Sequence, residues 1–324
     1  MELFALIIFA ALFISFLVIF IMDFMKNRKS KNKYHKGEVI TAYALLLPAV
    51  ILAFTFVLLP IFLSLSYAFT DYHRLRTLSF ADMNFVGFDQ FVKLFQDEEV
   101  LIALRNTAIF VSLVVPLQIT LALLLALFCN NKRRGTIIFK VCFFAPVAIS
   151  LSVTSFLWLM ILSPNPAGIM NSILGMFGVE AQDFLGKENS VLFWMVIMSA
   201  WQGCGFQMLI FLSALGNIRK DLYEASKIDG ANVFQRFFTV TLPGLKPTLL
   251  YILITVFVGA CRVLIQPKLL TGYATRSVTL SYYMYEVGYT RNLIGYSCAL
   301  AFVMTIVMGT ITLIQRKMLG EKKK

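Results

Sequence analysis

The side chains that could do chemistry are few in this sequence, and they favour binding over catalysis. No Gly-x-x-x-x-Gly-Lys-Ser/Thr motif is present, so the chain lacks the loop that holds nucleotide phosphates. The two histidines, His35 and His73, have no plausible catalytic partner nearby. The five cysteines stand in or beside apolar runs at no metal-ligand spacing, which indicates small packing residues. We therefore expect neither an enzyme nor a metal site.

Two late apolar runs contain polar and aromatic side chains that could bind a ligand able to donate and accept hydrogen bonds. The first run offers an indole ring and two amides, and the second offers a guanidinium and an amide. The candidate solute-pathway residues are Trp201, Gln202, Gly205, Gln207, Arg262 and Gln266. Packing between helices explains the residues of the first run equally well. An arginine inside a span is costly next to lipid, so Arg262 is expected to face the bundle, where it contacts either the solute or a second chain.

A polar stretch, Glu224–Pro243, separates those two apolar runs. Apolar residues at helical spacing predict a short helix over Ile218–Asp229, and Gly230 can take the positive φ that ends it. Asn232 is a suitable N-cap for a second short helix, Val233–Thr239. Such a pair at a membrane surface suits docking to a soluble partner, although an ordinary amphipathic loop is the simpler interpretation.

The composition indicates a membrane protein. Of the 324 residues, 59% are hydrophobic and only 14% are charged, and the mean hydropathy is +0.79. The net charge of +12 could suggest nucleic acid, but the basic residues form short clusters beside apolar runs. That pattern sets the orientation of a polytopic protein, with the clusters in the cytoplasm.

Seven apolar runs are long enough to cross a bilayer, so we predict an all-α fold. The expected spans are Leu3–Met22, Tyr43–Ala68, Thr107–Cys129, Ile137–Leu162, Val191–Leu212, Pro247–Ile265 and Ile294–Ile314. Pro48 and Pro60 are expected to kink the second span, and Leu242 to Pro247 to end the polar excursion and begin the sixth. The basic clusters place the N-terminus outside and both the polar stretch and the C-terminus in the cytoplasm.

The polar stretch resembles the loop that marks permease subunits of binding-protein-dependent ABC importers: Glu-Ala-Ala, two residues, Asp-Gly-Ala, then an aromatic-rich stretch closing in Leu-Pro. The matching residues are Glu224, Ala225, Asp229, Gly230, Ala231, Phe234, Phe237, Leu242, Pro243 and Pro247, with Ser226 where the second alanine usually stands. Phe69-Thr-Asp-Tyr72, Phe85-Val-Gly87 and Asn171 also resemble the sugar-importer branch of this family.

The resemblance covers about residues 42–318 and implies a six-span permease domain. Residues 1–41 would add one membrane helix and a basic linker, and residues 319–324 a basic tail. In this family the loop, here residues 213–246, inserts into a cytoplasmic ATPase. The residues implied for that contact are Glu224, Ala225, Ser226, Asp229, Gly230, Ala231, Phe234, Leu242 and Pro243. Val256, Gly259, Ala260 and Val263 stand where maltose-type members place polar sugar contacts.

The resemblance implies import of a carbohydrate or related solute across a bacterial or archaeal inner membrane. The implied partners are a second homologous permease, two ATPase subunits that bind ATP and Mg²⁺, and an extracytoplasmic solute-binding protein, with no nucleic acid and no cofactor on this chain. An ion-coupled secondary transporter is the alternative, yet no carboxylate lies well inside an expected span. A structural membrane scaffold would leave the loop signature unexplained.

Overall fold

The computed structural model describes residues 36–75, 83–130, 135–186, 188–270 and 277–319, besides Val18, Ile21 and Met22. Most of the expected first span and of the basic linker, the basic turn at 132–134 and the tail at 320–324 lie outside these residues. The described part contains five helices long and apolar enough to cross a membrane, or six if one bent pair counts as a span. The prediction of an all-α polytopic fold is confirmed.

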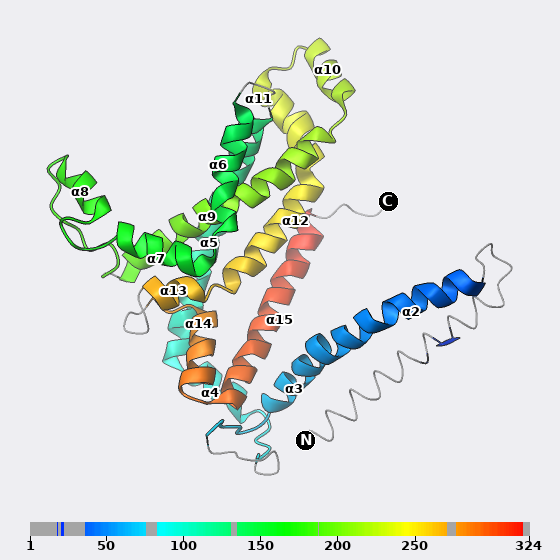
Figure 1. The fold of residues 1–324 in the computed structure, drawn as a ribbon, viewed down its shortest axis with the longest axis vertical. Coiled ribbons are helices and arrows are strands. Elements are labelled where there is room, and N and C mark those ends of the chain that lie inside the picture. Colours follow the sequence, from blue (N-terminus) through cyan, green and yellow to red (C-terminus); the bar gives the residue numbers. More distant parts are fainter. Residues whose placement is uncertain are drawn as a thin grey trace. The chain divides into compact units, whose positions relative to one another are not determined.

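The chain forms two units. The first comprises Met1–Gln96 with Glu286–Met304, and the second Asp97–Tyr285 with Thr305–Lys324. The helices of the first unit are α2 (Lys36–Ala53), the π turn η1 (Phe54–Leu58), α3 (Leu59–Tyr67), α4 (Asp89–Gln96), the π turn η5 (Glu286–Thr290) and the first part of α15 (Ile294–Leu319) (Figure 1). The last helix confirms the predicted seventh span.

The helix from Thr41 to Tyr67 is the predicted second span, and it changes geometry just before Pro60. The π turn η1 ends one residue before Leu59, which opens α3. Proline has no N–H to donate, and its ring crowds the carbonyl four residues earlier, so a wider turn relieves the clash. Pro48 lies inside α2 without a comparable change.

The Phe-Thr-Asp-Tyr segment after α3 is held in place by hydrogen bonds from Asn84 and Gln90. Asp71 accepts hydrogen bonds from the Asn84 backbone at 2.9 Å and from its amide at 3.0 Å, which lowers the pKa of the Asp71 carboxyl. Gln90 donates to the Thr70 carbonyl at 2.9 Å. A Cβ atom at Gly295 would lie 2.3 Å from that carbonyl, so only glycine permits this approach.

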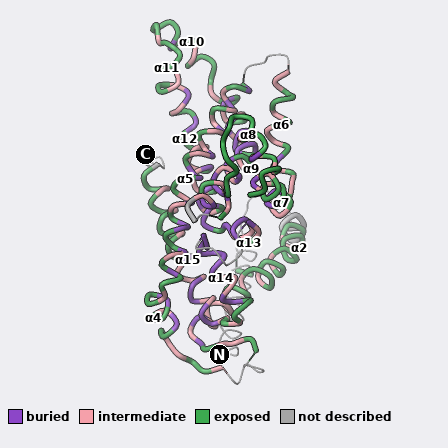
Figure 2. The backbone as a smooth tube through the Cα atoms, turned by 90° about the vertical axis from the view of Figure 1, so that its left-hand side faces the viewer, coloured by how far each residue is buried: buried purple, intermediate pink, exposed green. Residues whose placement is uncertain are grey.

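The second unit holds the remaining helices. They are α5 (Glu98–Cys129), α6 (Thr136–Ala148), α7 (Leu151–Ile161), α8 (Ile169–Gly175), α9 (Glu188–Gly216), α10 (Lys220–Ile228), α11 (Val233–Arg236), the π turn η3 (Phe237–Thr241), α12 (Leu242–Cys261), α13 (Ile265–Leu270) and α14 (Leu280–Tyr285). Buried residues are frequent on α5, α9, α13 and α14, whereas α10 and α11 are largely exposed (Figure 2). The core of this unit therefore lies along the α5–α9 pair.

Helix α5 begins well before the predicted start of the third span at Thr107. Asp97 caps it by accepting from the Glu99 backbone at 2.9 Å, and Glu98 and Glu99 favour the positive end of the helix dipole. The residues from Glu98 to Asn106, which precede the predicted third span, therefore form the first turns of the same helix.

The predicted fourth span, Ile137–Leu162, corresponds to two helices separated by a sharp bend, which the apolar pattern did not reveal. Helices α6 and α7 meet at a bend of 101°. Pro146 lies in the last turn of α6, and the Ser150 hydroxyl accepts from the Val153 backbone to begin α7. The Gln202 amide donates to the Ile149 carbonyl at 3.1 Å, which satisfies a backbone group freed by the break.

As predicted, the membrane helix after the polar stretch begins at Leu242-Pro243, but no break in the helix separates it from the second short helix. The helix runs on from Val233 through η3 into α12, with Pro243 tolerated in the first turn of α12 after a π turn, as at Pro60. This helix ends at Cys261, and Arg262 is its C-cap. Arg262 therefore stands at the C-terminus of α12, within the candidate span Val233–Leu270.

Candidate coupling helices and solute cavity

The turn between α10 and α11 is built on Gly230, which has the predicted positive φ, at 76°. The Ala231 N–H donates to the Ser226 carbonyl at 2.9 Å, and the Gly230 N–H donates to the Lys227 carbonyl at 3.1 Å. These two bonds form a Schellman motif, which satisfies carbonyls at the end of α10. An L-residue at position 230 would be strained.

The start of α11 is a capping box on Asn232. Its side chain accepts from the Gln235 backbone at 2.9 Å, and the Gln235 side chain accepts from the Asn232 backbone at 2.8 Å. The hydroxyl groups of Tyr223 and Thr241 are 3.0 Å apart and join α10 to η3. The two short helices are thus fixed to each other by caps and a cross-bond.

Most of the predicted coupling residues lie on the surface. Glu224, Ala225, Asp229, Gly230, Phe234 and Pro243 are exposed, whereas Ala231 and Leu242 are half-buried. Phe234 is 78% exposed and the neighbouring Ile228 86%. Ser226 differs, because it is buried and its hydroxyl donates to the Tyr223 carbonyl at 2.9 Å. Ser226 therefore contributes a buried side chain and a hydrogen bond within α10, and it is not available to contact a partner.

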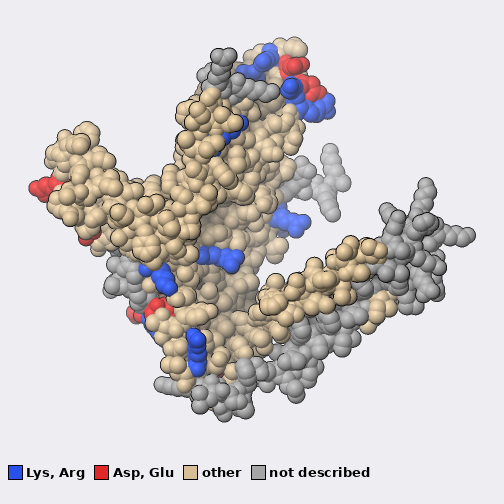
Figure 3. All heavy atoms as spheres, viewed as in Figure 1, with Lys and Arg blue, Asp and Glu red and all other residues tan. Residues whose placement is uncertain are grey.

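Charged side chains of both signs gather over α10 (Figure 3). Arg219 and Asp221 form an exposed ion pair, in which the hydrogen bond raises the pKa of Arg219 and lowers that of Asp221. The exposed surface of α10 and α11 thus carries both apolar side chains, Ile228 and Phe234, and charged ones, as protein-docking surfaces do.

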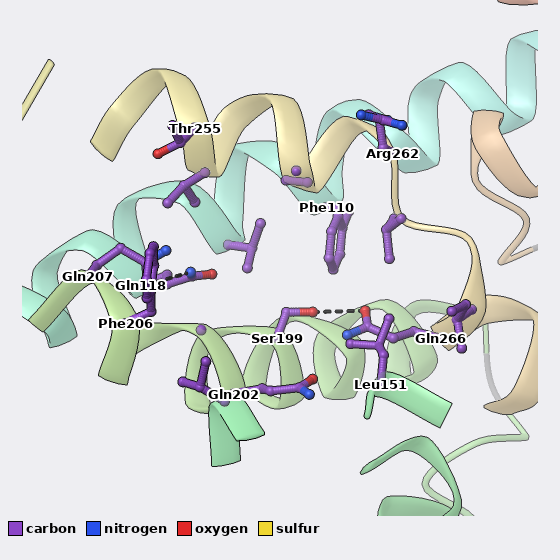
Figure 4. A pocket seen from close by; sticks show the side chains of 18 of the residues that line it. Phe110, Gln118, Leu151, Ser199, Gln202, Phe206, Gln207, Thr255, Arg262 and Gln266 are labelled. Atoms are coloured by element: carbon purple, nitrogen blue, oxygen red, sulfur yellow. Dashed lines mark hydrogen bonds between the residues drawn. The ribbon is translucent and has the colours of Figure 1, made fainter. Parts of the chain in front are cut away.

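A cavity of about 600 Å³ lies between α5, α9, α12 and α13. Its polar lining consists of Gln118, Ser199, Gln202, Gln207, Thr255, Arg262 and Gln266 (Figure 4). Phe110 on α5 and Phe206 on α9 add aromatic rings to the lining. Amides, hydroxyls and aromatic faces together can bind a ligand that both donates and accepts hydrogen bonds.

The contribution of α9 to this cavity follows helical spacing. Ser199, Gln202, Gly203, Phe206 and Gln207 recur at intervals of three, four, seven and eight residues, which places them on one face. A Cβ atom at Gly203 would lie 2.2 Å from the Gln118 amide nitrogen, so glycine makes room for that side chain. This periodicity would have identified Ser199 from the sequence.

Hydrogen bonds between helices order the cavity wall. Ser199 donates to the Gln266 side-chain oxygen at 2.8 Å, and the Gln118 amide donates to the Gln207 side-chain oxygen at 3.1 Å. Gln202 Nε2 donates to Ile149 O and lies 3.2 Å from Thr154 Oγ1. Gln202 Oε1 is buried and has no partner among the described residues.

Two of the six predicted solute-pathway residues do not line this cavity. Trp201 packs against Trp158, with ring centroids 6.1 Å apart. Gly205 contacts α6, because a Cβ atom there would lie 2.0 Å from the Phe143 carbonyl oxygen. Gln202, Gln207, Arg262 and Gln266 do line it. Sequence reasoning missed Gln118, whose amide is isolated in an apolar run and whose partner Gln207 is distant in sequence.

Arg262 lies at the edge of the cavity with its guanidinium directed away from Ser199 and Gln202 (Figure 4). Its side chain is exposed, and its position at the C-terminus of α12 places a cation at the negative end of that helix. Val256, Gly259, Ala260 and Val263 line the cavity and bring no polar side chain to it.

Membrane-length helices, one of them bent, a polar cavity between them and an exposed pair of short helices define this chain as a polytopic membrane permease. The chain belongs to the family of binding-protein-dependent transport system inner membrane components, which it matches over residues 118–323. Proteins of this family are translocation subunits and are not themselves catalytic.

Individual relatives match along most of their length. The probable ABC transporter permease protein YesP of Bacillus subtilis (strain 168) is 32% identical over 300 residues, covering 90% of this chain and 93% of that protein. The arabinooligosaccharides transport system permease protein AraP of the same strain is 32% identical over 246 residues, covering 75% and 78%. A bacterial alginate ABC transporter, crystallised with an alginate pentasaccharide-bound periplasmic protein, has a chain that matches with a TM-score of 0.76 and 26% identity, covering 87% and 94%.

Proposed function

We propose that this chain is the permease subunit of an ATP-driven importer and forms half of the translocation pathway for a carbohydrate. The observation that carries the proposal is the cavity lined by four glutamines, two hydroxyl residues and two phenylalanines. Sugar hydroxyls both donate and accept, as primary amides do, and the apolar face of a sugar ring packs on aromatic side chains. Relatives named for arabinooligosaccharides and alginate support the same class of solute.

Energy would enter through α10 and α11. The exposed side chains of Glu224, Ile228 and Phe234 are proposed to contact a cytoplasmic ATPase subunit, which would supply ATP and Mg²⁺ chemistry that this chain lacks. Gly230 and Asn232 would hold the two helices at the angle that the ATPase cleft requires. Movement of the ATPase would then reach the cavity along α12, because η3 and α12 continue α11 without a break.

The complete importer would contain this chain, a second homologous permease, two ATPase subunits and a solute-binding protein outside the membrane. A solved relative in complex with a periplasmic protein supports the last partner. We place the chain in a bacterial or archaeal inner membrane, with its N-terminus outside and its C-terminus in the cytoplasm, from the distribution of basic residues.

Co-purification and transport test the proposal together. A tagged chain, solubilised from membranes of its host, should bring down a second permease and an ATPase. Vesicles containing the complex should take up sugar when ATP is supplied and should do so equally well after ionophores collapse the ion gradients. Uptake that follows the ion gradient without ATP would instead favour a secondary transporter.

A further inference from the structure

Two hydrogen bonds between helices join side chains that line the cavity. Ser199 joins α9 to Gln266 on α13, and Gln207 joins α9 to Gln118 on α5; we refer to them as the α13 tie and the α5 tie. Figure 4 shows these ties on opposite sides of the cavity. Ser199 and Gln207 are eight residues apart, which is about 12 Å along the helix.

Both ties use buried amides. Gln118, Gln207 and Gln266 are 8%, 9% and 3% exposed. A buried amide that loses its partner is destabilising, so each tie opens readily only where another donor or acceptor takes its place. A solute that carries hydroxyl groups along its length provides such replacements at both ends.

The α13 tie involves a helix that is separated from α12 by a break in the helical backbone. Residues 262–264 interrupt the helix between them, and α13 packs against α7 and α9. Thr279 donates to the Val263 carbonyl at 2.8 Å and Ser281 to the Cys261 carbonyl at 3.0 Å. The interruption is therefore satisfied by side chains and does not depend on the α13 tie.

The charges around the cavity indicate the class of solute. Among the described lining residues there is no carboxylate, and the guanidinium of Arg262 is directed away from the polar centre. An anionic group inside would need a paired cation to offset its desolvation. An uncharged solute needs only the amides and hydroxyls that are present.

We propose that the two ties are the gates of the solute cavity, and that an uncharged sugar longer than one ring opens them by exchanging its hydroxyls for the tied groups. The α13 tie closes the end farther from the coupling helices, and the α5 tie closes the end nearer to them. This inference rests on the proposed function, since it takes the cavity to be the solute pathway.

The first test uses the complete transporter in liposomes and measures ATP hydrolysis in the absence of solute. Ser199→Ala removes the donor of the α13 tie and should raise this hydrolysis about fivefold, the change that corresponds to losing a hydrogen bond of ordinary strength. Ser112→Ala is the matched control, because Ser112 bonds only within α5, to Ile109 at 2.9 Å, and lies outside the cavity. If Ser199→Ala behaves like Ser112→Ala, the α13 tie is not a gate.

A double variant separates a tie from two independent effects. Gln266→Leu removes the acceptor of the same bond, so combining it with Ser199→Ala should add little to the stronger single change. Effects that multiply would contradict the proposal. Should Gln266→Leu fail to assemble, Ser199→Ala alone still decides.

The second test measures binding of labelled sugars to the purified transporter without its binding protein. Glucose, a panel of neutral disaccharides and a disaccharide of uronic acids are compared. A neutral disaccharide should bind best and should lose affinity in Gln118→Leu. Equal binding of glucose, preference for the uronic acids, or no binding of any neutral disaccharide would each overturn the proposed solute class.

Absence of an associated ATPase would refute the proposed function instead. ATP-driven uptake together with unchanged ATP hydrolysis in Ser199→Ala would refute this inference alone.

Discussion

Gly230 decides the geometry of the coupling helices at the scale of one residue. Its φ of 76° lies in the left-handed region, and a Cβ atom there would meet no atom within 4 Å. Gly230→Val is therefore penalised by backbone strain alone, on the order of 1 to 2 kcal/mol. We expect the chain to insert normally while the amount of co-purified ATPase and the rate of uptake both fall.

Gly178 supplies the control for this experiment. It has the same φ of 76° and an equally open Cβ position, but it lies in the segment after α8, away from α10 and α11. Gly178→Val should leave ATPase association unchanged. Normal transport by Gly230→Val would show that the turn is not the coupling element.

Arg262 was expected to contact either the solute or a second chain, and its position in the structure favours one of these roles. The guanidinium is exposed at the cavity edge and directed away from the polar centre, which favours contact with the second permease. We expect Arg262→Gln to reduce the amount of second permease that co-purifies, and Arg262→Lys to preserve part of it because the charge remains. Unchanged assembly with a raised KM for uptake would place Arg262 on the solute.

Local chemistry explains which residue roles the sequence could predict. Gly230 and Asn232 were predictable because a Schellman motif and a capping box depend on a few adjacent residues. The partners of Gln118 and Ser199 are far away in sequence and come into contact only when α5, α9 and α13 pack. Ser226 turned inward because its side of α10 faces the rest of the chain, which a motif match does not reveal.

At the scale of elements, the main differences between the predicted spans and the observed helices are breaks in the helices, which hydropathy does not reveal. The run over Ile137–Leu162 is predominantly apolar, yet it bends by 101° where the distant Gln202 amide donates to the freed Ile149 carbonyl. The break after Cys261 likewise depends on hydroxyls of Thr279 and Ser281. In a membrane a break survives only if such donors satisfy it, so its prediction requires the tertiary structure.

The segment around α8 is held together by one buried asparagine. Asn171 Nδ2 donates to the carbonyls of Ser163, Asn165 and Gln182 at 3.1, 3.3 and 3.0 Å, and its Oδ1 accepts from the Gln182 backbone at 2.9 Å. Asn171→Leu leaves these groups without that partner and should destabilise the segment by about 2 to 4 kcal/mol. Amide hydrogen exchange over residues 163–186 should then accelerate.

Asn165 is the matched control in the same segment, because its exposed side chain makes a single bond, to the Ala167 backbone at 2.9 Å. Asn165→Ala should change exchange far less than Asn171→Leu. Similar acceleration in both variants would mean that Asn171 is not the residue that orders this segment.

Orientation in the membrane is the property of the whole molecule on which the proposed mechanism depends. Nineteen of the 29 lysines and arginines fall in the four segments predicted to face the cytoplasm, which are Lys26–Lys36, Lys132–Arg134, Arg219–Lys246 and Arg316–Lys324. The described spans agree in number with the six-span core when α6 and α7 count as one. This agreement arises because span number follows from length and hydropathy alone, whereas the division into domains at residues 42 and 318 remains a prediction.

Single cysteines can test this orientation directly. In a variant without the five native cysteines, Asn232→Cys and Lys33→Cys should react with a membrane-impermeant thiol reagent only from the cytoplasmic side. Gln182→Cys should react only from the outside. Asn232 and Gln182 are both exposed, so neither site is protected by the fold. If Asn232→Cys were labelled from outside, α10 and α11 would face away from any cytoplasmic ATPase, and ATP could not drive transport through them.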